Sequence, residues 1–136
     1  MSLYLCVFRG EEELDGVDVG SYEDFERLRD VARSIDGRVF RRFGILRTNV
    51  SPTTAWRPRA AARLEAELRA FAQELRSRPP RPFPDGSWQA RVAAARGTPP
   101  ATLYDCFFDV EGRPLVERLL ALCRLSIETR QPILFQ

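Results

Sequence analysis

The side chains that most often carry catalysis are missing from this sequence. None of its 136 residues is histidine, the commonest general base and metal ligand. None is lysine either, so all 21 basic residues are arginine, which excludes a Schiff-base lysine and a P-loop lysine. No Gly-x-Ser-x-Gly segment is present. These absences predict a protein that is not an enzyme and has no catalytic residues.

The three cysteines could in principle bind a metal or form a disulfide. Cys6, Cys106 and Cys123 are widely spaced, and each lies within an apolar run. An odd number without a Cys-x-x-Cys pair argues against both a disulfide framework and a metal site. We interpret them as small buried hydrophobic residues in a reducing compartment, and we expect no metal and no cofactor.

One pair of carboxylates, Asp105 and Asp109, has a spacing that could serve chemistry. Residues four apart share one side of a helix and also one face of a strand. Paired carboxylates can perform acid–base or metal-assisted reactions. Glu111 and Gly112 lie shortly after Asp109, however, and together they are typical of a turn. We interpret both aspartates as strand-edge and loop residues.

Charge is distributed unevenly along the chain, although the net charge is only +2. Residues 1–36 carry ten acidic residues against four arginines. Five of these acidic residues fall within eight positions of a predicted polar loop, Arg9–Gly20: Glu11, Glu12, Glu13, Asp15 and Asp18. Carboxylates this close repel one another, which favours a well-solvated loop or contact with a basic partner. This run is the candidate site for partner binding.

The middle of the chain has the opposite charge, because residues 37–100 carry thirteen arginines against four acidic residues. Within the segment 38–63 these arginines are Arg38, Arg41, Arg42, Arg47, Arg57, Arg59 and Arg63. A nucleic-acid-associated regulatory domain that uses this segment is therefore an alternative hypothesis. No helix-turn-helix, RNP or zinc-finger pattern accompanies the arginines, which favours a solvated face instead.

Periodicity predicts the elements that must position these residues. Leu3–Phe8 is apolar at every position, which is typical of a central strand covered on both faces. Ser21 begins a helix with a near capping box, and Gly37 ends it. Arg38–Val50 predicts one strand, or two short strands bent at Gly44. A long helix then follows from about Pro58 to Ser77, with Leu64, Leu68, Phe71 and Leu75 on its core face.

The second half begins with a proline-rich connection, Arg78–Gly86, which is typical of extended chain. Ser87 and Gly97 bound a short helix, and Leu103–Val110 predicts a strand. Pro114–Arg130 predicts a helix that is apolar over more than half its girth, with Leu119 and Ile127 among its buried positions. Ile133–Phe135 predicts a closing strand.

Together these elements predict one α+β domain over residues 1–136, with a small mixed β-sheet packed against about four helices. No apolar run approaches the roughly 20 residues needed to span a membrane. The amino terminus has no basic region and no cleavage site of a signal peptide, so a cytoplasmic protein is expected.

The whole chain also resembles a family of bacterial immunity proteins from polymorphic toxin systems, the immunity protein 70 family. The resemblance lies in Met1–Phe8, Asp15–Tyr22, Asp24-Phe25, Trp56-x-Pro58, Trp88-Gln89, Leu103-Tyr104, Phe108–Gly112, Pro114-Leu115 and Gln131–Gln136. It implies an α+β cytoplasmic protein, encoded beside a toxin, that binds and neutralises the toxin domain. It implies no catalytic residues. One segment departs from the family pattern: Arg47–Ala55 contains no acidic residue where relatives are acidic.

Overall fold

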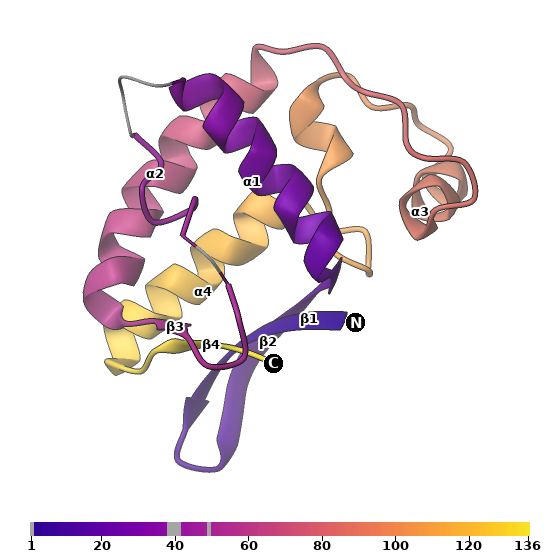
Figure 1. The fold of residues 1–136 in the computed structure, drawn as a ribbon. Helices are drawn as coiled ribbons and strands as arrows, with labels where there is room; N and C mark the ends of the chain where they lie inside the picture. The colour runs from indigo at the N-terminus through magenta and orange to yellow at the C-terminus, as the bar shows by residue number, and fades with distance from the viewer. Residues whose placement is uncertain (1, 38–41, 49) are drawn as a thin grey trace.

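The fold is a four-stranded sheet with helices packed on it, in a computed structural model that describes residues 2–37, 42–48 and 50–136 (Figure 1). In chain order the elements are β1 (Ser2–Arg9), β2 (Glu12–Ser21), α1 (Tyr22–Asp36), β3 (Ala55–Trp56), α2 (Pro58–Arg76), α3 (Trp88–Arg96), the 3₁₀ helix η1 (Leu103–Cys106), α4 (Leu115–Thr129) and β4 (Ile133–Phe135). The predicted α+β class and the approximate number of helices are confirmed. No helix in the described part of the chain is long and apolar enough to cross a membrane.

The strands lie in the order β2-β1-β4-β3, so Leu3–Phe8 does form an inner strand, as predicted. The closing strand is also confirmed, because Leu134 pairs with Cys6 on one side and with Ala55 on the other. Every pairing is antiparallel, so the prediction of a mixed sheet is wrong. The reason is local: β2 returns directly beside β1 through a short turn, which leaves no crossover helix to make these two strands parallel.

The predicted loop Arg9–Gly20 is wrong, because most of it is strand β2. The chain turns at Gly10 and Glu11, where Gly10 has a φ of +62° that glycine adopts without strain. Acidic residues and glycines are uncommon in strands, which made this segment look like a loop. The overlooked signal is the alternation of Val17 and Val19, both buried, with Val17 directly opposite Leu5.

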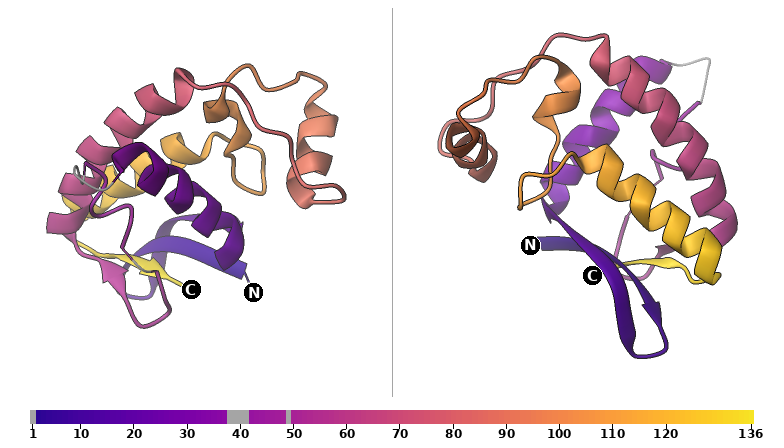
Figure 2. Two further views of the ribbon diagram at one scale, coloured as in Figure 1. Left: turned by 45° about the horizontal axis from the view of Figure 1, so that its top comes forward. Right: turned by 180° about the vertical axis from the view of Figure 1, so that it is seen from behind.

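The helices follow their predicted boundaries closely. Ser21 caps α1 in a reciprocal capping box with Asp24, and α2 buries all four of its predicted core residues. Helix α4 packs along α2 and buries Leu115, Val116, Leu119, Leu122, Cys123 and Ser126. Ile127 is the exception, since it is 36% exposed although the pattern predicts burial. Figure 2 shows α1, α2 and α4 together on one side of the sheet.

Two predicted strands are absent from the described residues. Within Arg38–Val50, residues 42–47 form turns, and residues 38–41 and 49 lie outside the described part of the chain. Buried carboxylates replace strand pairing here: Asp36 accepts hydrogen bonds from the backbone of Arg42 and Phe43, and Glu67 accepts them from Ile45 and Leu46. Burial raises the pKa of Glu67 against the lowering effect of these hydrogen bonds.

The other wrong strand is Leu103–Val110, which forms the 3₁₀ helix η1 followed by a loop. Only Phe108 makes a strand-like bridge, to Pro114. Asp105 closes a capping box with Thr102, and this local hydrogen bonding competes with an extended conformation.

Candidate partner-binding hairpin

The β1–β2 hairpin extends away from the helices, and its tip lies at the lower end of the molecule in Figure 1. Glu11, Glu12 and Glu13 are exposed at this tip. The two-residue turn places these three residues in succession at the end of a paired ribbon, where Glu12 and Glu13 point to opposite faces. These glutamates are therefore accessible and lie on a strand end and its turn.

The five predicted acidic residues do not form one continuous cluster. Asp15 lies directly opposite Val7, on the side of the sheet that faces the helices. There it pairs with Arg118 of α4 at 3.3 Å, and the same guanidinium donates to the carbonyl of Gly16 at 2.7 Å. Asp18 lies opposite Tyr4, so its side chain points to the other side. Its carboxylate accepts from the backbone of Gly20 at 2.9 Å.

Asp109 holds the loop that lies along the outer edge of β2. It is only 2% exposed, and its Oδ1 accepts hydrogen bonds from the backbone of Glu111 and Arg113 at 2.9 and 3.0 Å. Its Oδ2 lies 3.4 Å from Nε of Arg118. The backbone of Val110 donates to the carbonyl of Asp18 at 3.1 Å. The loop therefore covers part of the β2 edge, where backbone groups would otherwise be open to another strand.

The two aspartates considered for chemistry are used in separate turns. Asp105 accepts from the backbone of Ala101 and Thr102, whereas Asp109 serves the loop that follows. Both are occupied in shaping backbone, as their interpretation as structural residues predicts. Within the described residues, no group of three or more cysteine, aspartate or glutamate side chains is arranged to hold a metal ion.

A polar cavity of about 380 Å³ lies between β2 and the loop that follows Phe108. Its charged lining residues are Glu13, Asp15, Asp18, Asp109, Glu111, Arg113 and Arg118. Tyr4 also lines it, and burial together with a hydrogen bond to Glu13 raises the pKa of the Tyr4 hydroxyl to about 12. Gly16 makes room for this ring, because a Cβ there would lie 2.0 Å from the Tyr4 oxygen. The excess of carboxylates makes this side of the hairpin acidic.

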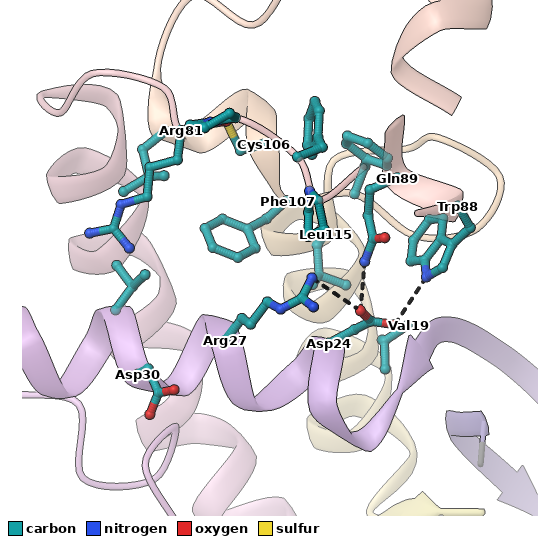
Figure 3. Close-up of a pocket in the computed structure, with 16 residues that line it drawn as sticks. Val19, Asp24, Arg27, Asp30, Arg81, Trp88, Gln89, Cys106, Phe107 and Leu115 are labelled. Atoms are coloured by element: carbon teal, nitrogen blue, oxygen red, sulfur yellow. Dashed lines mark hydrogen bonds and ion pairs between the residues drawn. The ribbon is translucent and has the colours of Figure 1, made fainter. Parts of the chain in front are cut away.

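A second cavity, of about 260 Å³ and mainly apolar, lies between α1, α3 and the proline-rich connection (Figure 3). Asp24 lies at its edge and accepts hydrogen bonds from Nε1 of Trp88 at 3.0 Å and from Nε2 of Gln89 at 2.7 Å. Burial acts to raise the pKa of Asp24, but these bonds and those from Ser21 outweigh it and lower the pKa. Sequence reasoning missed this contact, since nothing local links residues 64 positions apart.

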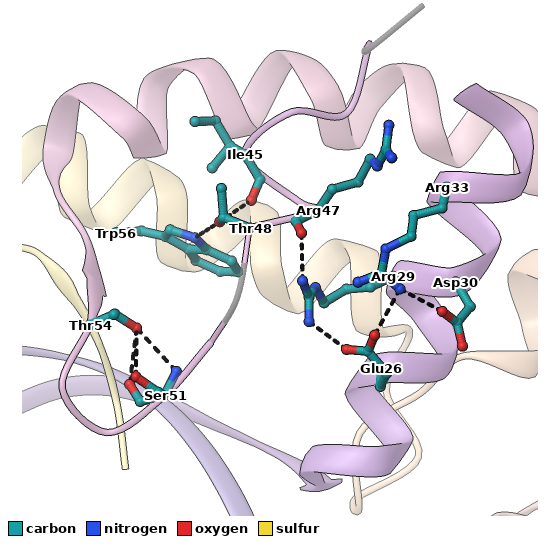
Figure 4. Close-up of polar contacts among 10 residues, drawn as sticks. All are labelled: Glu26, Arg29, Asp30, Arg33, Ile45, Arg47, Thr48, Ser51, Thr54 and Trp56. Atoms are coloured by element: carbon teal, nitrogen blue, oxygen red, sulfur yellow. Dashed lines mark hydrogen bonds and ion pairs between the residues drawn. The ribbon is translucent and has the colours of Figure 1, made fainter. Parts of the chain in front are cut away.

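The arginine-rich segment is partly neutralised within the chain. Arg42 pairs with Glu74 at 3.1 Å, and Arg47 pairs with buried Asp36 at 3.4 Å. Arg29 of α1 donates to the backbone carbonyl of Arg47 and so ties the turn to the helix (Figure 4). The remaining arginines of the predicted cluster divide into exposed Arg57, Arg59 and Arg63 and undescribed Arg38 and Arg41.

All three cysteines are free, and Cys6 and Cys123 are buried as predicted. Burial raises the pKa of Cys6 to about 11 and that of Cys123 to about 12. Cys106 is intermediate in exposure, and burial also raises its pKa. Because the thiolate is the reactive form, these shifts make the thiols poor nucleophiles at neutral pH.

Comparison with known proteins assigns the chain to a family by its sequence. A family model described as Immunity protein 70 matches residues 3–135, from the start of β1 to the end of β4. Searches of curated proteins and of solved structures give no match. The family match covers both the acidic hairpin and the helices that pack against the sheet. This chain belongs to the immunity protein 70 family.

Proposed function

We propose that this protein binds and neutralises a cognate bacterial toxin domain, and that it acts by contact and without catalysis. The observation that carries the proposal is the family match across residues 3–135. The covered length supports a single binding unit formed by residues 1–136, because both strands at the ends of the chain belong to the same sheet.

The proposed contact region is the acidic hairpin that carries Glu11, Glu12, Glu13, Asp15 and Asp18, in which Asp15 is turned towards Arg118 of α4. The strongest support comes from the three exposed glutamates at its tip. Like charges held side by side repel one another, and a basic partner relieves that repulsion when it binds. The same charges speed encounter with a basic surface, which matters for a protein that must reach its toxin before the toxin acts.

The proposed mechanism is occlusion or distortion of the toxin's active site. A projecting hairpin supports this mode, because it can reach into a concave site while the helical body remains outside. The acidity is local, since the whole chain carries a net charge of +2. This balance supports docking at one basic patch and does not favour broad imitation of a nucleic-acid backbone.

Co-expression tests the proposal. The toxin domain encoded beside this gene should arrest growth by itself and should be neutralised when this chain is present. Reversing Glu11, Glu12 and Glu13 to arginine should abolish protection, because the reversed tip repels a basic partner. The matched control reverses exposed Arg57, Arg59 and Arg63 to glutamate and should leave protection intact. Absence of protection by the unmodified chain would reject the function, and protection by the hairpin variant would reject only the contact region.

One observation favours a second candidate, a nucleic-acid-associated regulatory domain. Helix α2 has no acidic residue in its first turn and carries exposed Arg57, Arg59 and Arg63 near its amino end, where the helix dipole is also positive. Binding of generic DNA and RNA, titrated with salt, tests this candidate. A steep loss of affinity with salt that disappears in the triple arginine reversal would support it. If no binding is measurable at low salt, the nucleic-acid candidate is rejected and the immunity proposal is the remaining one.

A further inference from the structure

The outward face of β1 is apolar where a solvated sheet face is expected to be polar. Tyr4, Cys6 and Phe8 alternate with core residues of the same strand, so they share the face that points away from the helices. An antiparallel sheet with one solvated face normally alternates apolar and polar residues. The sequence alone predicts that β1 is covered on both faces, whereas no helix of the described residues lies on this face, where Cys6 is fully buried and Tyr4 and Phe8 are half-buried.

The apolar face continues into the neighbouring strands. Leu134 of β4 lies directly opposite Cys6, and Ala55 of β3 lies directly opposite Leu134. In the views of Figure 2, α1, α2 and α4 lie on the other side of the sheet. Within residues 2–37, 42–48 and 50–136, the outward face is therefore shielded mainly by its own side chains, which leave Tyr4, Phe8 and Leu134 half-buried and Ala55 exposed.

Acidic residues border this face along β2. Glu13 lies opposite Phe8, and Asp18 lies opposite Tyr4. Asp15 does not belong to the border, because it points to the helices and pairs with Arg118. Of the five acidic residues predicted from the sequence, Glu13 and Asp18 can therefore meet a partner at this face, whereas Asp15 cannot.

We propose that the helix-free face of the sheet, centred on Tyr4, Phe8 and Leu134 and bordered by Glu13 and Asp18, is the surface on which the toxin docks. The fitting partner surface has an apolar centre and arginine or lysine side chains at its rim. This inference rests on the proposed function and specifies which side of the hairpin is used. An apolar centre inside a polar rim is the usual anatomy of a protein interface.

Charge complementarity selects this occupant over two others. A second copy of the chain, related by two-fold symmetry, would bring the same acidic border against itself, and like charges face to face cost affinity. A nucleic acid carries phosphates, which the same border repels. A basic protein surface satisfies both the apolar centre and the charged border.

Binding measurements with the catalytically inactivated toxin domain encoded beside the gene test the proposal. Phe8→Ala should weaken binding by about tenfold to a hundredfold, as expected for an anchor at the centre of an interface. Glu13→Arg should lower the association rate by about tenfold and reduce its dependence on salt. The matched controls lie on α4, where Ile127→Ala and Glu128→Arg alter exposed residues and should change affinity less than about twofold.

A second measurement uses the unmodified protein and so does not depend on how the variants fold. Carbodiimide labelling of carboxylates should fall at Glu13 and Asp18 in the complex and remain unchanged at Glu128. Circular dichroism and thermal unfolding confirm that each variant retains its fold.

The outcomes separate this inference from the proposed function. Wild-type affinity in Phe8→Ala and Glu13→Arg, with labelling unchanged, would overturn the docking face while toxin binding itself stands. Failure of the unmodified chain to bind the toxin would overturn both. A concentration-dependent dimer that Phe8→Ala abolishes would assign the face to a second copy of this chain and would also overturn the proposal.

Discussion

Helices α3 and α4 are both marked clearly in the sequence, but they are attached to the molecule by different forces. Helix α4 buries a broad apolar face against α2 and the sheet. Helix α3 buries only Gln89 and stands apart from the body in Figure 2. Trp88 and Gln89 of α3 donate hydrogen bonds to Asp24 of α1. The Trp88 ring also packs edge-on against Phe108, with 5.9 Å between the ring centroids.

This contrast shows that a well-capped helix need not be a core helix. Ser87 and Gly97 define α3 locally, and Ser21 does the same for α1. Caps specify where a helix begins and ends, whereas burial of apolar area supplies most of the stability that holds it in place. We therefore expect α4 to open only with the whole fold and α3 to open locally at lower free energy.

The largest expected effect lies in α4. Leu119→Ala should lower the free energy of unfolding by about 2–5 kcal/mol, because Leu119 is fully packed and the substitution leaves a cavity. Ile127→Ala on the same helix is the control, and its exposed position predicts a change within about 0.5 kcal/mol. Urea denaturation measures both. A loss under about 1 kcal/mol for Leu119→Ala would contradict the role of α4 as the core helix.

A smaller effect is expected where α3 is attached. Asp24→Ala removes the acceptor for the Ser21 backbone in the capping box of α1 and the acceptor for Trp88 and Gln89, so about 1–3 kcal/mol should be lost. Amide hydrogen exchange should accelerate most in α3, while α4 stays protected. Asp30→Ala is the matched control on the same helix, because Asp30 is exposed and its ion pair with Arg33 lies at the surface. Equal acceleration in α3 and α4 would contradict separate attachment.

The contact at Asp24 should also depend on pH in one direction. The folded protein lowers the pKa of Asp24 from its ordinary value of 3.8. Its contribution to stability is therefore complete above that value and is lost as the pH falls through the lower folded pKa. The indole N–H NMR signal of Trp88, followed from pH 7 to pH 2, should stay constant to about pH 4 and shift below it. A transition near pH 6 would contradict this assignment.

The smallest expected effect compares the two helix ends. Helix α3 ends at Gly97 with a φ of +71°, whereas α4 ends at Arg130 with a φ of +57°. A left-handed conformation costs about 1 kcal/mol more for a side-chain-bearing residue than for glycine. Arg130→Gly should therefore raise the free energy of unfolding by about 0.5–1 kcal/mol, measured by thermal unfolding. A decrease in the free energy of unfolding would show that contacts of the Arg130 side chain stabilise the fold by more than the backbone strain destabilises it.

Sequence patterns predicted the regions whose structure is decided by nearby residues. The caps of α1 and α3, the core face of α2 and the apolar strand β1 were all recognised because each signal lies within about one element. The two wrong strands and the missed strand β2 have other causes. Asp36 and Glu67 satisfy the backbone of Phe43 and Leu46, and the capping box at Asp105 competes with an extended conformation. Strand β2 was missed because acidic residues and glycines are uncommon in strands.

The sequence predicted the residues of the candidate site but not the directions of their side chains. The sequence identified Glu11, Glu12, Glu13, Asp15 and Asp18 as a group, because their spacing is visible in the chain. It could not show that Glu13 and Asp15 point to opposite faces, since residues two apart in a regular strand share a face and only the register shift between Val7 and Phe8 separates them. Nor could it show that Tyr4 and Phe8 would lack a covering helix.

By itself, the sequence determined that this protein has no histidine or lysine for catalysis and that residues 1–36 are acidic. It also determined that the chain contains a strongly apolar helix and apolar strands. Hydrophobic periodicity and capping are local properties, and family membership follows from residues along nearly the whole chain. Only the tertiary structure decided which acidic residues face solvent and which face of β1 is left without a helix. The physical reason is that strand register and side-chain pairing join distant segments, and no local pattern encodes which segments meet.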